Sequence, residues 1–294
     1  MERDCFDDNE ELCREEISEE NAGEEIYKEK RVSERINMAG RLDGKIAVVT
    51  GSGSGIGQAI AERLAQEGAN CVVDYRDHVE EAQATRDKIE AAGGKAVMVH
   101  ADVSVLADCT NLIEQAWAQL GSCDILVNNA GIEKEADFVD VTEADYDAVL
   151  NVNLKGAFFL TQAFVRKLQA AKKPGRVINI SSVHEDMVFP HFSTYCASKG
   201  GMRMLMRDLA VELGPLGITV NNIAPGAINT PINKSLLADK PKLDALLANI
   251  PLGRLGNPEE VAGVAAFLAS DDGSYVTGST YFLDGGLIRN YHEQ

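Results

Sequence analysis

The sequence contains few basic residues for its length. Its 294 residues include 28 lysines and arginines against 46 aspartates and glutamates, and the formal net charge at pH 7 is −18. A surface with this charge repels the phosphate backbone of nucleic acids and anionic lipid headgroups. We therefore expect neither a nucleic-acid partner nor a membrane partner.

The sequence also lacks the patterns of membrane, secreted and metal-binding proteins. No run reaches the roughly 18 consecutive apolar residues of a transmembrane helix, and the chain does not open on a basic segment followed by an apolar run, as a secretory signal does. No cysteine pair has C-x-x-C spacing or another metal-ligand pattern, so we expect reduced thiols, a cytoplasmic protein and no bound metal. The six cysteines are Cys5, Cys13, Cys71, Cys109, Cys123 and Cys196.

The N-terminal segment 1–40 differs in composition from the rest of the chain. It carries fourteen acidic and six basic residues, few large apolar residues and no clean hydrophobic period. Such a composition predicts a disordered or loosely helical acidic tail. Met38 stands just before the folded pattern, and we hypothesise that it is the native start. Intact-mass analysis of the protein from its own host would overturn this hypothesis by detecting residues 1–37.

From Lys45 onward, short apolar runs alternate with segments of helical periodicity. This alternation predicts right-handed βαβ units and a doubly wound, Rossmann-type α/β fold, with a seven-stranded parallel sheet and helices on both faces. Residues 41–294 are expected to form a single domain. The predicted strands are 46–50, 71–74, 96–99, 125–128, 176–180, 219–223 and 280–283. The predicted helices are 55–67, 79–92, a helix from 104 or 108 to 120, 143–172, 194–213 and 258–269.

A glycine-rich turn joins the first predicted strand to the first predicted helix. Glycines at this place let the backbone approach a pyrophosphate, and they direct the helix N-terminus at it. The turn therefore predicts a dinucleotide site, in which we expect the glycines to be sterically constrained. Its candidate cofactor-binding residues are Gly51, Ser52, Ser54, Gly55, Ile56 and Gly57.

The end of the second predicted strand carries both an acid and a base, Asp74 and Arg76. An acid at this place accepts hydrogen bonds from the ribose hydroxyls of NAD, whereas an arginine accommodates the 2′-phosphate of NADP. The sequence predicts NAD or NADP as the cofactor and leaves the choice open.

Tyr195 and Lys199 are spaced to share one face of a helix, and Ser182 lies thirteen residues earlier. An ammonium about 4 Å from a phenol, in a dielectric of about 20, contributes about 4 kcal/mol. That could lower the pKa of the tyrosine by up to about three units before desolvation opposes the shift. Together with the glycine turn, this pattern predicts a nicotinamide-dependent oxidoreductase in which Tyr195 is the base.

The set of motifs from about residue 41 onward resembles the short-chain dehydrogenase/reductase family. The motifs that carry the resemblance are Thr50-Gly51-x-x-x-Gly55-x-Gly57, Asn128-Asn129-Ala130-Gly131, Asn153, Ser182, Tyr195 with Lys199, and Pro225-Gly226.

The resemblance implies several roles and a homotetramer. Ser182 holds the substrate oxygen, Lys199 also binds the nicotinamide ribose, and Asn153 positions a water in a proton relay. Ser181 and Asn151 are the rivals for two of these roles, and the family's spacing favours Ser182 and Asn153. Further cofactor contacts are implied at the adenine (Asp102, Val103), along the cofactor (Asn129, Ala130, Gly131) and beside the nicotinamide (Pro225, Gly226, Ile228, Thr230).

Within this family, stretches 128–133, 177–185 and 226–233 resemble bacterial glucose 1-dehydrogenases. This resemblance implies oxidation of C1 of β-D-glucose to glucono-1,5-lactone, with Tyr195 and Ser182 at the reacting hydroxyl. Glu133 and His184 are candidates for further substrate contacts. Glu133 fits an ordinary surface-loop acid equally well. His184, with Glu185 beside it, fits ordinary loop polar residues better, because a lone histidine is more often structural than catalytic.

Two other functions remain open. The first is a 3-oxoacyl-carrier-protein reductase or another carbonyl reductase of the same family, although a net charge of −18 argues against the basic docking patch that a carrier protein needs. The second is a nucleotide-binding regulator without catalysis, which the presence of all four candidate catalytic residues disfavours.

Overall fold

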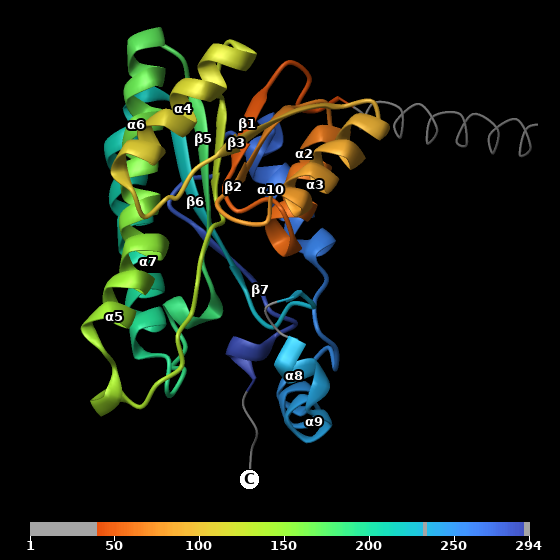
Figure 1. Ribbon diagram of the computed structural model, residues 1–294, viewed down its shortest axis with the longest axis vertical. Helices are drawn as coiled ribbons and strands as arrows, with labels where there is room; N and C mark the ends of the chain where they lie inside the picture. The colour runs from red at the N-terminus through yellow and green to blue at the C-terminus, as the bar shows by residue number, and fades with distance from the viewer. Residues whose placement is uncertain (1–39, 232–233, 291–294) are drawn as a thin grey trace, which may run out of the picture. The chain divides into compact units, whose positions relative to one another are not determined.

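The computed structural model describes residues 40–231 and 234–290. Residues 1–39 of the predicted acidic tail, and Met38 within them, lie outside the described residues. From Leu42 the chain forms one compact unit built on a seven-stranded sheet with the order β3-β2-β1-β4-β5-β6-β7 (Figure 1). All neighbouring strands are parallel, so the predicted doubly wound fold is confirmed.

The strands lie close to the predicted ranges because each is a short, buried apolar run. Strand order reverses between β1 and β4, and in open α/β sheets ligands bind beyond the carboxyl ends of the strands at such a reversal. The strands are β1 (Ile46–Val49), β2 (Asn70–Tyr75), β3 (Lys95–His100), β4 (Ile125–Asn128), β5 (Gly175–Ile180), β6 (Ile218–Pro225) and β7 (Thr280–Leu283).

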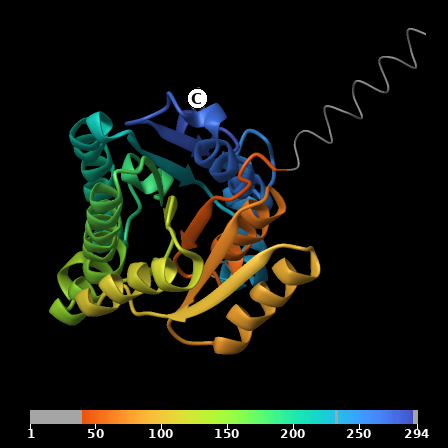
Figure 2. The ribbon, with the colours of Figure 1, turned by 90° about the horizontal axis from the view of Figure 1, so that it is seen from above.

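Helices cover both faces of the sheet (Figures 1 and 2). One layer contains α2 (Gly55–Gln66), α3 (Val79–Ala91) and α10 (Pro258–Ala269), and the other contains α4 (Leu106–Leu120), α6 (Ala157–Ala171) and α7 (Ser193–Leu213). The remaining α-helices are α5 (Glu143–Leu150), α8 (Lys234–Ala238) and α9 (Lys240–Asn249). Short 3-10 segments are η1 (Phe138–Asp140), η3 (Val183–Glu185), η4 (Gly214–Leu216), η6 (Asp271–Gly273) and η7 (Leu287–Arg289).

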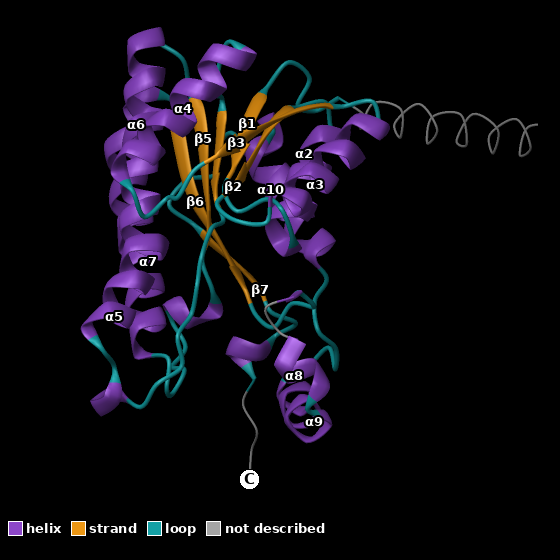
Figure 3. Ribbon diagram, viewed as in Figure 1, coloured by secondary structure: helices purple, strands orange, loops and turns teal. Residues whose placement is uncertain are grey.

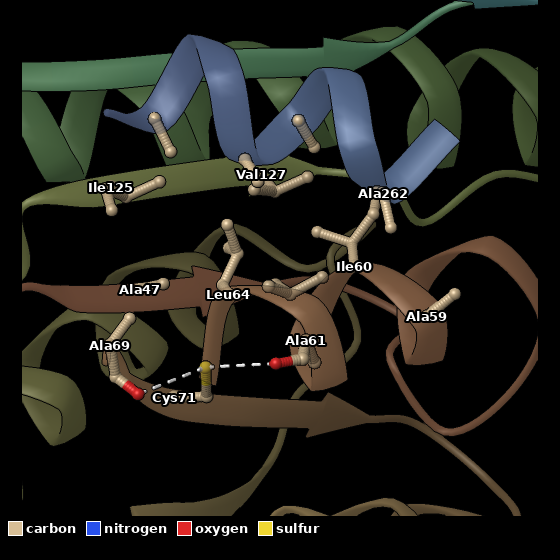
Figure 4. Packing of buried hydrophobic residues seen from close by; sticks show 14 of the residues in the cluster. Ala47, Ala59, Ile60, Ala61, Leu64, Ala69, Cys71, Ile125, Val127 and Ala262 are labelled. Carbon is tan, nitrogen blue, oxygen red and sulfur yellow. Dashed lines mark hydrogen bonds between the residues drawn. The ribbon is translucent and has the colours of Figure 1, made fainter. Parts of the chain in front are cut away.

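The apolar stripe predicted on α2 forms the centre of one core layer. Ile60 and Leu64 are fully buried between the sheet and α10, where Ala262 faces them (Figure 4). Alanines on both helices leave room for this close approach. Truncating a leucine in such a core typically costs 2–5 kcal/mol, so this layer holds the glycine turn before α2 in place.

The predicted helix 143–172 is divided in the structure. A π-helical turn, η2 (Asn151–Gly156), separates α5 from α6. By length and composition the whole stretch Glu143–Ala171 could cross a membrane. However, Leu160, Phe164 and Leu168 of α6 are buried against α4 and the sheet, so its apolar face belongs to the protein core. A π turn within a helix frequently marks a functional site.

Helices α8 and α9 were not predicted from the sequence. Both lie beyond the carboxyl end of β7 in Figure 3, on the side of the sheet where the strands end. Asp239 caps α9 by accepting a hydrogen bond from the backbone of Lys242 at 3.2 Å, and Pro241 lies in the first turn. These short helices place Leu236 and Leu246 beside the cavity described next.

Candidate active site

A cavity of about 1200 Å³ lies at the carboxyl ends of the strands. Nearly all the residues predicted to form the site line it, including Tyr195, Lys199 and Asp74. The exceptions are Ser52, Gly57 and Asn153, which lie behind the lining. The other lining residues among those predicted are Gly51, Ser54, Gly55, Ile56, Arg76, Asp102, Val103, Asn129, Ala130, Gly131, Glu133, Ser182, His184, Pro225, Gly226, Ile228 and Thr230.

The glycine turn forms a cradle at one end of the cavity. Gly51 (φ +59°) and Gly55 (φ +58°) have left-handed backbones, which favour glycine. A Cβ at Gly57 would collide with the Asn129 side chain and the Gly51 carbonyl oxygen. Behind the cradle, the buried Ser52 hydroxyl donates to Val49 O at 2.8 Å and accepts from Asp74 N at 3.1 Å. The turn is therefore fixed to both β1 and β2.

Gly57→Ala is expected to destabilise the protein by about 1–3 kcal/mol, because the added methyl group forces the Gly51 turn and Asn129 apart. Affinity for NAD(P) should fall together with stability. Thermal unfolding and cofactor titration measure both effects. Gly214→Ala is the matched control, because Gly214 has a helical backbone with open space around it. Equal behaviour of the two variants would contradict the steric argument.

Thr50 joins the glycine turn to the segment after β4, a role that the sequence analysis did not assign. Its hydroxyl accepts hydrogen bonds from the backbone nitrogens of Asn129 and Ala130, both at 2.9 Å. The side chain of Asn129 in turn donates a hydrogen bond from Nδ2 to Thr50 O at 2.8 Å. These bonds set the floor of the cavity where strand order reverses.

Asp74 is buried at the end of β2, and only one of its two carboxylate oxygens has a hydrogen-bond partner among the described residues. Its Oδ2 accepts from Gly51 N at 3.0 Å, whereas Oδ1 has no hydrogen-bond partner among the described residues. Burial raises the pKa of Asp74 to about 7, the Gly51 N–H opposes the shift, and the charges of Asp102 and Asp108 add to it. A buried acceptor without a partner is costly unless a ligand supplies the donor.

Arg76 lies at the same end of the cavity in a different environment. Its side chain is half-exposed and pairs with Asp77 at 2.7 Å. The unpartnered Oδ1 of Asp74 fits a ribose hydroxyl, and the guanidinium of Arg76 fits a 2′-phosphate. The residues present therefore suit a nicotinamide dinucleotide of either kind.

Tyr195, Ser182 and Lys199 meet at the other end of the cavity. Ser182 follows β5 and lies beside Tyr195 of α7, close enough for its hydroxyl to lower the pKa of the phenol. Lys199, one helical turn after Tyr195, donates from Nζ to Ile180 O at 2.8 Å and lies 5.6 Å from the centre of the Tyr195 ring. The Ser181 hydroxyl, the rival for the Ser182 role, has no hydrogen-bond partner among the described residues.

The structure does not show the predicted lowering of the pKa of Tyr195. Burial raises the pKa of Tyr195 to about 12; the bond with Ser182 lowers it, and Glu133 and Cys196 raise it further. Burial also lowers the pKa of Lys199 to about 8, opposed by Glu185 and Glu133. The cost of removing the phenolate from water is thus the largest contribution to the pKa of Tyr195. With this pKa, Tyr195 is protonated at neutral pH.

Asn153 occupies the π-helical turn η2 and is fully buried. Its Oδ1 accepts from Ile132 N at 2.9 Å, and its Nδ2 donates to Ile132 O at 2.9 Å and to Ser198 Oγ at 3.0 Å. The amide thus joins the segment after β4 to α7. Asn151 makes no such contact among those observed, so the geometry supports Asn153 over its rival.

Comparison with known proteins identifies the family of the chain. Residues 51–288 match a family model described as Enoyl-(Acyl carrier protein) reductase, adh_short_C2. 3beta-hydroxysteroid dehydrogenase 1 of Eggerthella lenta is 47% identical over 246 residues, which are 84% of this chain and 94% of that protein. The chain belongs to the short-chain dehydrogenase/reductase family.

Further relatives in the short-chain dehydrogenase/reductase family act on different substrates. Glucose 1-dehydrogenase 2 of Bacillus subtilis is 41% identical over 247 residues, 84% of this chain and 95% of that protein. A crystal structure of a gluconate 5-dehydrogenase from Burkholderia cenocepacia, in complex with NADP and tartrate, matches with a TM-score of 0.82 at 37% identity, over 86% of this chain and 99% of that one. The family uses NAD or NADP, which confirms the predicted cofactor class.

Aromatic rings line the cavity next to the short-chain dehydrogenase/reductase residues, and the sequence analysis missed two of them. The rings of His184 and Phe189 stack at 4.2 Å, and those of Phe189 and Phe192 stack at 4.0 Å. Met187 O lies 3.2 Å from Nδ1 of His184, and a carbonyl only accepts, so Nδ1 carries the proton and Nε2 is an acceptor. Burial lowers the pKa of His184, which keeps the ring neutral at pH 7. We call His184, Phe189 and Phe192 the aromatic wall.

Proposed function

We propose that this protein is an NAD(P)-dependent dehydrogenase that oxidises a hydroxyl group on a saturated ring. The observation that carries the proposal is the arrangement of Tyr195 beside Ser182 and Lys199, in the same cavity as the unpartnered carboxylate oxygen of Asp74. A proton acceptor, an oxygen-binding hydroxyl and a cofactor-binding acid thereby face a common space.

The chemistry divides among the catalytic residues. The Ser182 hydroxyl holds the substrate oxygen, and Tyr195 takes its proton. An oxidised nicotinamide bound along the glycine turn would supply the acceptor for the hydride of the same carbon, and a positive charge. The ammonium of Lys199 favours the phenolate of Tyr195 and binds the nicotinamide ribose. Asn153 holds the segment after β4 and positions the water of the proton relay. The alcohol loses one hydride and one proton, so the product is a carbonyl compound.

β-D-glucose oxidised at C1 to glucono-1,5-lactone is our first candidate reaction. The relatives named Glucose 1-dehydrogenase 2 and L-rhamnose 1-dehydrogenase (NAD(P)(+)) support it. Glu133 is half-buried at the cavity with a pKa raised mainly by burial. Its carboxylate and Nε2 of His184 offer hydrogen-bond acceptors to further hydroxyls of a sugar.

An apolar ring alcohol is a second candidate, and the aromatic wall favours it. The stacked rings of Phe189 and Phe192 line the cavity with apolar surface. Leu236, Leu246 and the largely exposed Val188 extend this surface. The relative named 3beta-hydroxysteroid dehydrogenase 1 supports a substrate of this kind. A flat apolar ring gains more from this contact than a sugar, whose hydroxyls need polar partners.

A substrate panel tests the proposal. Formation of NADH and NADPH is measured with β-D-glucose, L-rhamnose and a 3β-hydroxysteroid, and acetoacetyl esters are offered with NADPH for the opposite direction. We expect turnover of at least one ring alcohol. Reduction of acetoacetyl esters without oxidation of any ring alcohol would instead favour the ketoacyl-reductase alternative.

Phe189→Ala is expected to separate the two substrate classes. Removing the central ring of the aromatic wall should lower kcat/KM for an apolar ring alcohol by about 10- to 100-fold, because a pocket contact of this size contributes about 1–3 kcal/mol. Glucose oxidation should change much less. Phe158→Ala, on the partly exposed face of α6, is the matched control. Equal losses for sugar and apolar alcohol would contradict a wall that selects apolar rings.

We further propose a cytoplasmic homotetramer. Exposed apolar side chains on the described surface, such as Phe138, Val139, Met204 and Val211, offer area for association. The free thiols of Cys71, Cys109 and Cys123 suit a reducing compartment. Sizing chromatography should give a tetramer, and a monomer would refute the proposal.

A further inference from the structure

A row of polar side chains, of which the three asparagines are buried, crosses four strands next to the candidate active site. Asn128 of β4 is in register with Asn179 of β5, which pairs with Asn222 of β6, which pairs with Thr280 of β7. Side chains in register on parallel strands point to the same face of the sheet. We call these four residues the polar row.

The hydrogen bonds of the polar row converge on the carboxylate of Glu185. Asn128 donates from Nδ2 to Asn179 Oδ1 at 2.8 Å, and Asn179 donates from Nδ2 to Asn222 Oδ1 at 3.0 Å. Asn222 donates from Nδ2 to Oε2 of Glu185 at 2.9 Å, and Thr280 donates from Oγ1 to Oε1 of Glu185 at 2.7 Å. The row therefore ends on a side chain that accepts at both oxygens, as an ionised carboxylate does.

Glu185 belongs to the loop that carries the candidate catalytic serine. Its backbone nitrogen donates to Ser182 O at 3.0 Å, and η3 packs against α7 and β6. The carboxylate is completely buried, with Arg203 of α7 3.6 Å away. Through its side chain, Glu185 thus ties the Ser182–His184 loop to β6, β7 and the helix of Tyr195 and Lys199.

We propose that Glu185 is a positioning residue for this active site: its buried carboxylate anchors the Ser182–His184 loop to the polar row and supplies a fixed negative charge to Lys199. The proposal rests on the proposed dehydrogenase function and on NAD(P) as cofactor. It assigns Glu185 no contact with the substrate or the reacting atoms. The polar row explains why an acid is buried here without a catalytic task of its own.

The electrostatic part of the proposal involves few charged groups. Glu185, from η3, and Glu133, from the segment after β4, raise the pKa of Lys199 against the effect of burial. Tyr195 is the titratable neighbour on α7 itself. Around Glu185, the charged groups are Arg203 of α7 and Asp186, which pairs with Arg203 at 2.8 Å. Loss of the Glu185 charge should therefore move the pKa of Lys199 further down.

Glu185→Gln tests the charge with little change of shape. The amide can accept from Asn222 while donating to Thr280 Oγ, so the polar row remains bonded. We expect NADPH affinity in the wild type to fall as the pH rises through the pKa of Lys199, about 8. In Glu185→Gln this midpoint should move down by about one unit, as loss of one nearby charge predicts. The rising limb of kcat/KM for alcohol oxidation should move to higher pH, because Tyr195 loses the neighbouring cation sooner.

Two further variants separate charge from anchoring. Asp186→Asn removes a charge from the same loop outside the polar row and should leave both pH profiles unchanged. Thr280→Val keeps the Glu185 charge but removes one of its donors, so kcat should fall severalfold with the pH midpoint of NADPH affinity unchanged.

Three results would overturn the proposal. The first is a folded Glu185→Gln protein whose pH midpoint of NADPH affinity equals that of the wild type. The second is an Asp186→Asn protein in which this midpoint shifts as much as in Glu185→Gln. The third is a Thr280→Val protein with unchanged kcat. The third applies even where Glu185→Gln does not fold. Because NADPH affinity is measured without substrate, failure of the proposed substrate class leaves the electrostatic test intact.

Discussion

Replacing Tyr195 by phenylalanine is expected to lower kcat for alcohol oxidation by at least about 10²-fold, and by up to about 10⁴-fold, the range of a positioned general base. The ring and its contacts with His184 and Lys199 remain, but the phenol that accepts the substrate proton is lost. Steady-state kinetics with the best substrate of the panel, together with NADPH titration, measure the effect.

Cofactor affinity of the Tyr195→Phe variant should stay within a few-fold of wild type, because Lys199 keeps its bond to Ile180 O and Asp74 is untouched. Tyr146→Phe, on the exposed side of α5, is the matched control and should behave as wild type. A Tyr195→Phe protein that kept more than about a tenth of wild-type turnover would exclude Tyr195 as the base.

Asp74→Asn is expected to change the preference between NAD and NADP by about 10²-fold. Hydrogen bonds to a charged group contribute about 1.5–3 kcal/mol, so loss of the carboxylate weakens the hold on the NAD ribose. Removing a negative charge from the end of β2 also relieves the repulsion of a 2′-phosphate. Dissociation constants for NADH and NADPH measure the ratio, and Arg76→Ala should move it in the opposite direction.

In the wild-type protein, the ratio of the dissociation constants for NADH and NADPH should also depend on pH. The pKa of Asp74 is raised to about 7, so the carboxyl group is neutral below that pH and charged above it. NADPH should therefore bind relatively better below pH 7, and the preference should move toward NADH as the pH rises through 7. In Asp74→Asn this dependence should be lost. A wild-type ratio independent of pH, or an unchanged ratio in the variant, would contradict the assignment.

The sequence predicts the sheet well because its signals are local. Each strand contains a short apolar run, such as residues 46–49 in β1 and 125–128 in β4. The glycine turn follows the run in β1. The helical stripe of Ile56, Ile60 and Leu64 places α2 on the sheet in the same way. These features depend on a few neighbouring residues, so periodicity and turn chemistry suffice.

The features that the sequence did not predict depend on contacts between distant segments. A π-helical turn at Asn153 keeps the composition of a continuous helix, and α8 and α9 are too short to show a clear period. Phe189 and Phe192 stack across a turn in which Phe192 N donates to Phe189 O at 3.1 Å, and such a turn has no hydrophobic period. The asparagines at corresponding positions near the ends of three strands are a signal for the polar row, but it becomes visible only once strand register is known.

The pKa of Tyr195 also depends on contacts that the sequence does not reveal. Spacing to Lys199 correctly placed a cation beside the ring, yet it carried no information on how completely the phenol and the ammonium are removed from water. Burial is the largest cause of both pKa shifts, raising the pKa of Tyr195 and lowering that of Lys199. An oxidised nicotinamide bound beside Tyr195 would add a positive charge that favours the phenolate.

The central claim, hydride transfer from a ring carbon to the nicotinamide, is tested most directly with a substrate deuterated at the hydroxyl-bearing carbon. For the ring alcohol that the protein oxidises best, we expect the deuterium to be recovered on the nicotinamide ring of the reduced cofactor, with none released to water. Reduced cofactor that carries no deuterium, or the absence of cofactor reduction with every ring alcohol offered, would contradict the account.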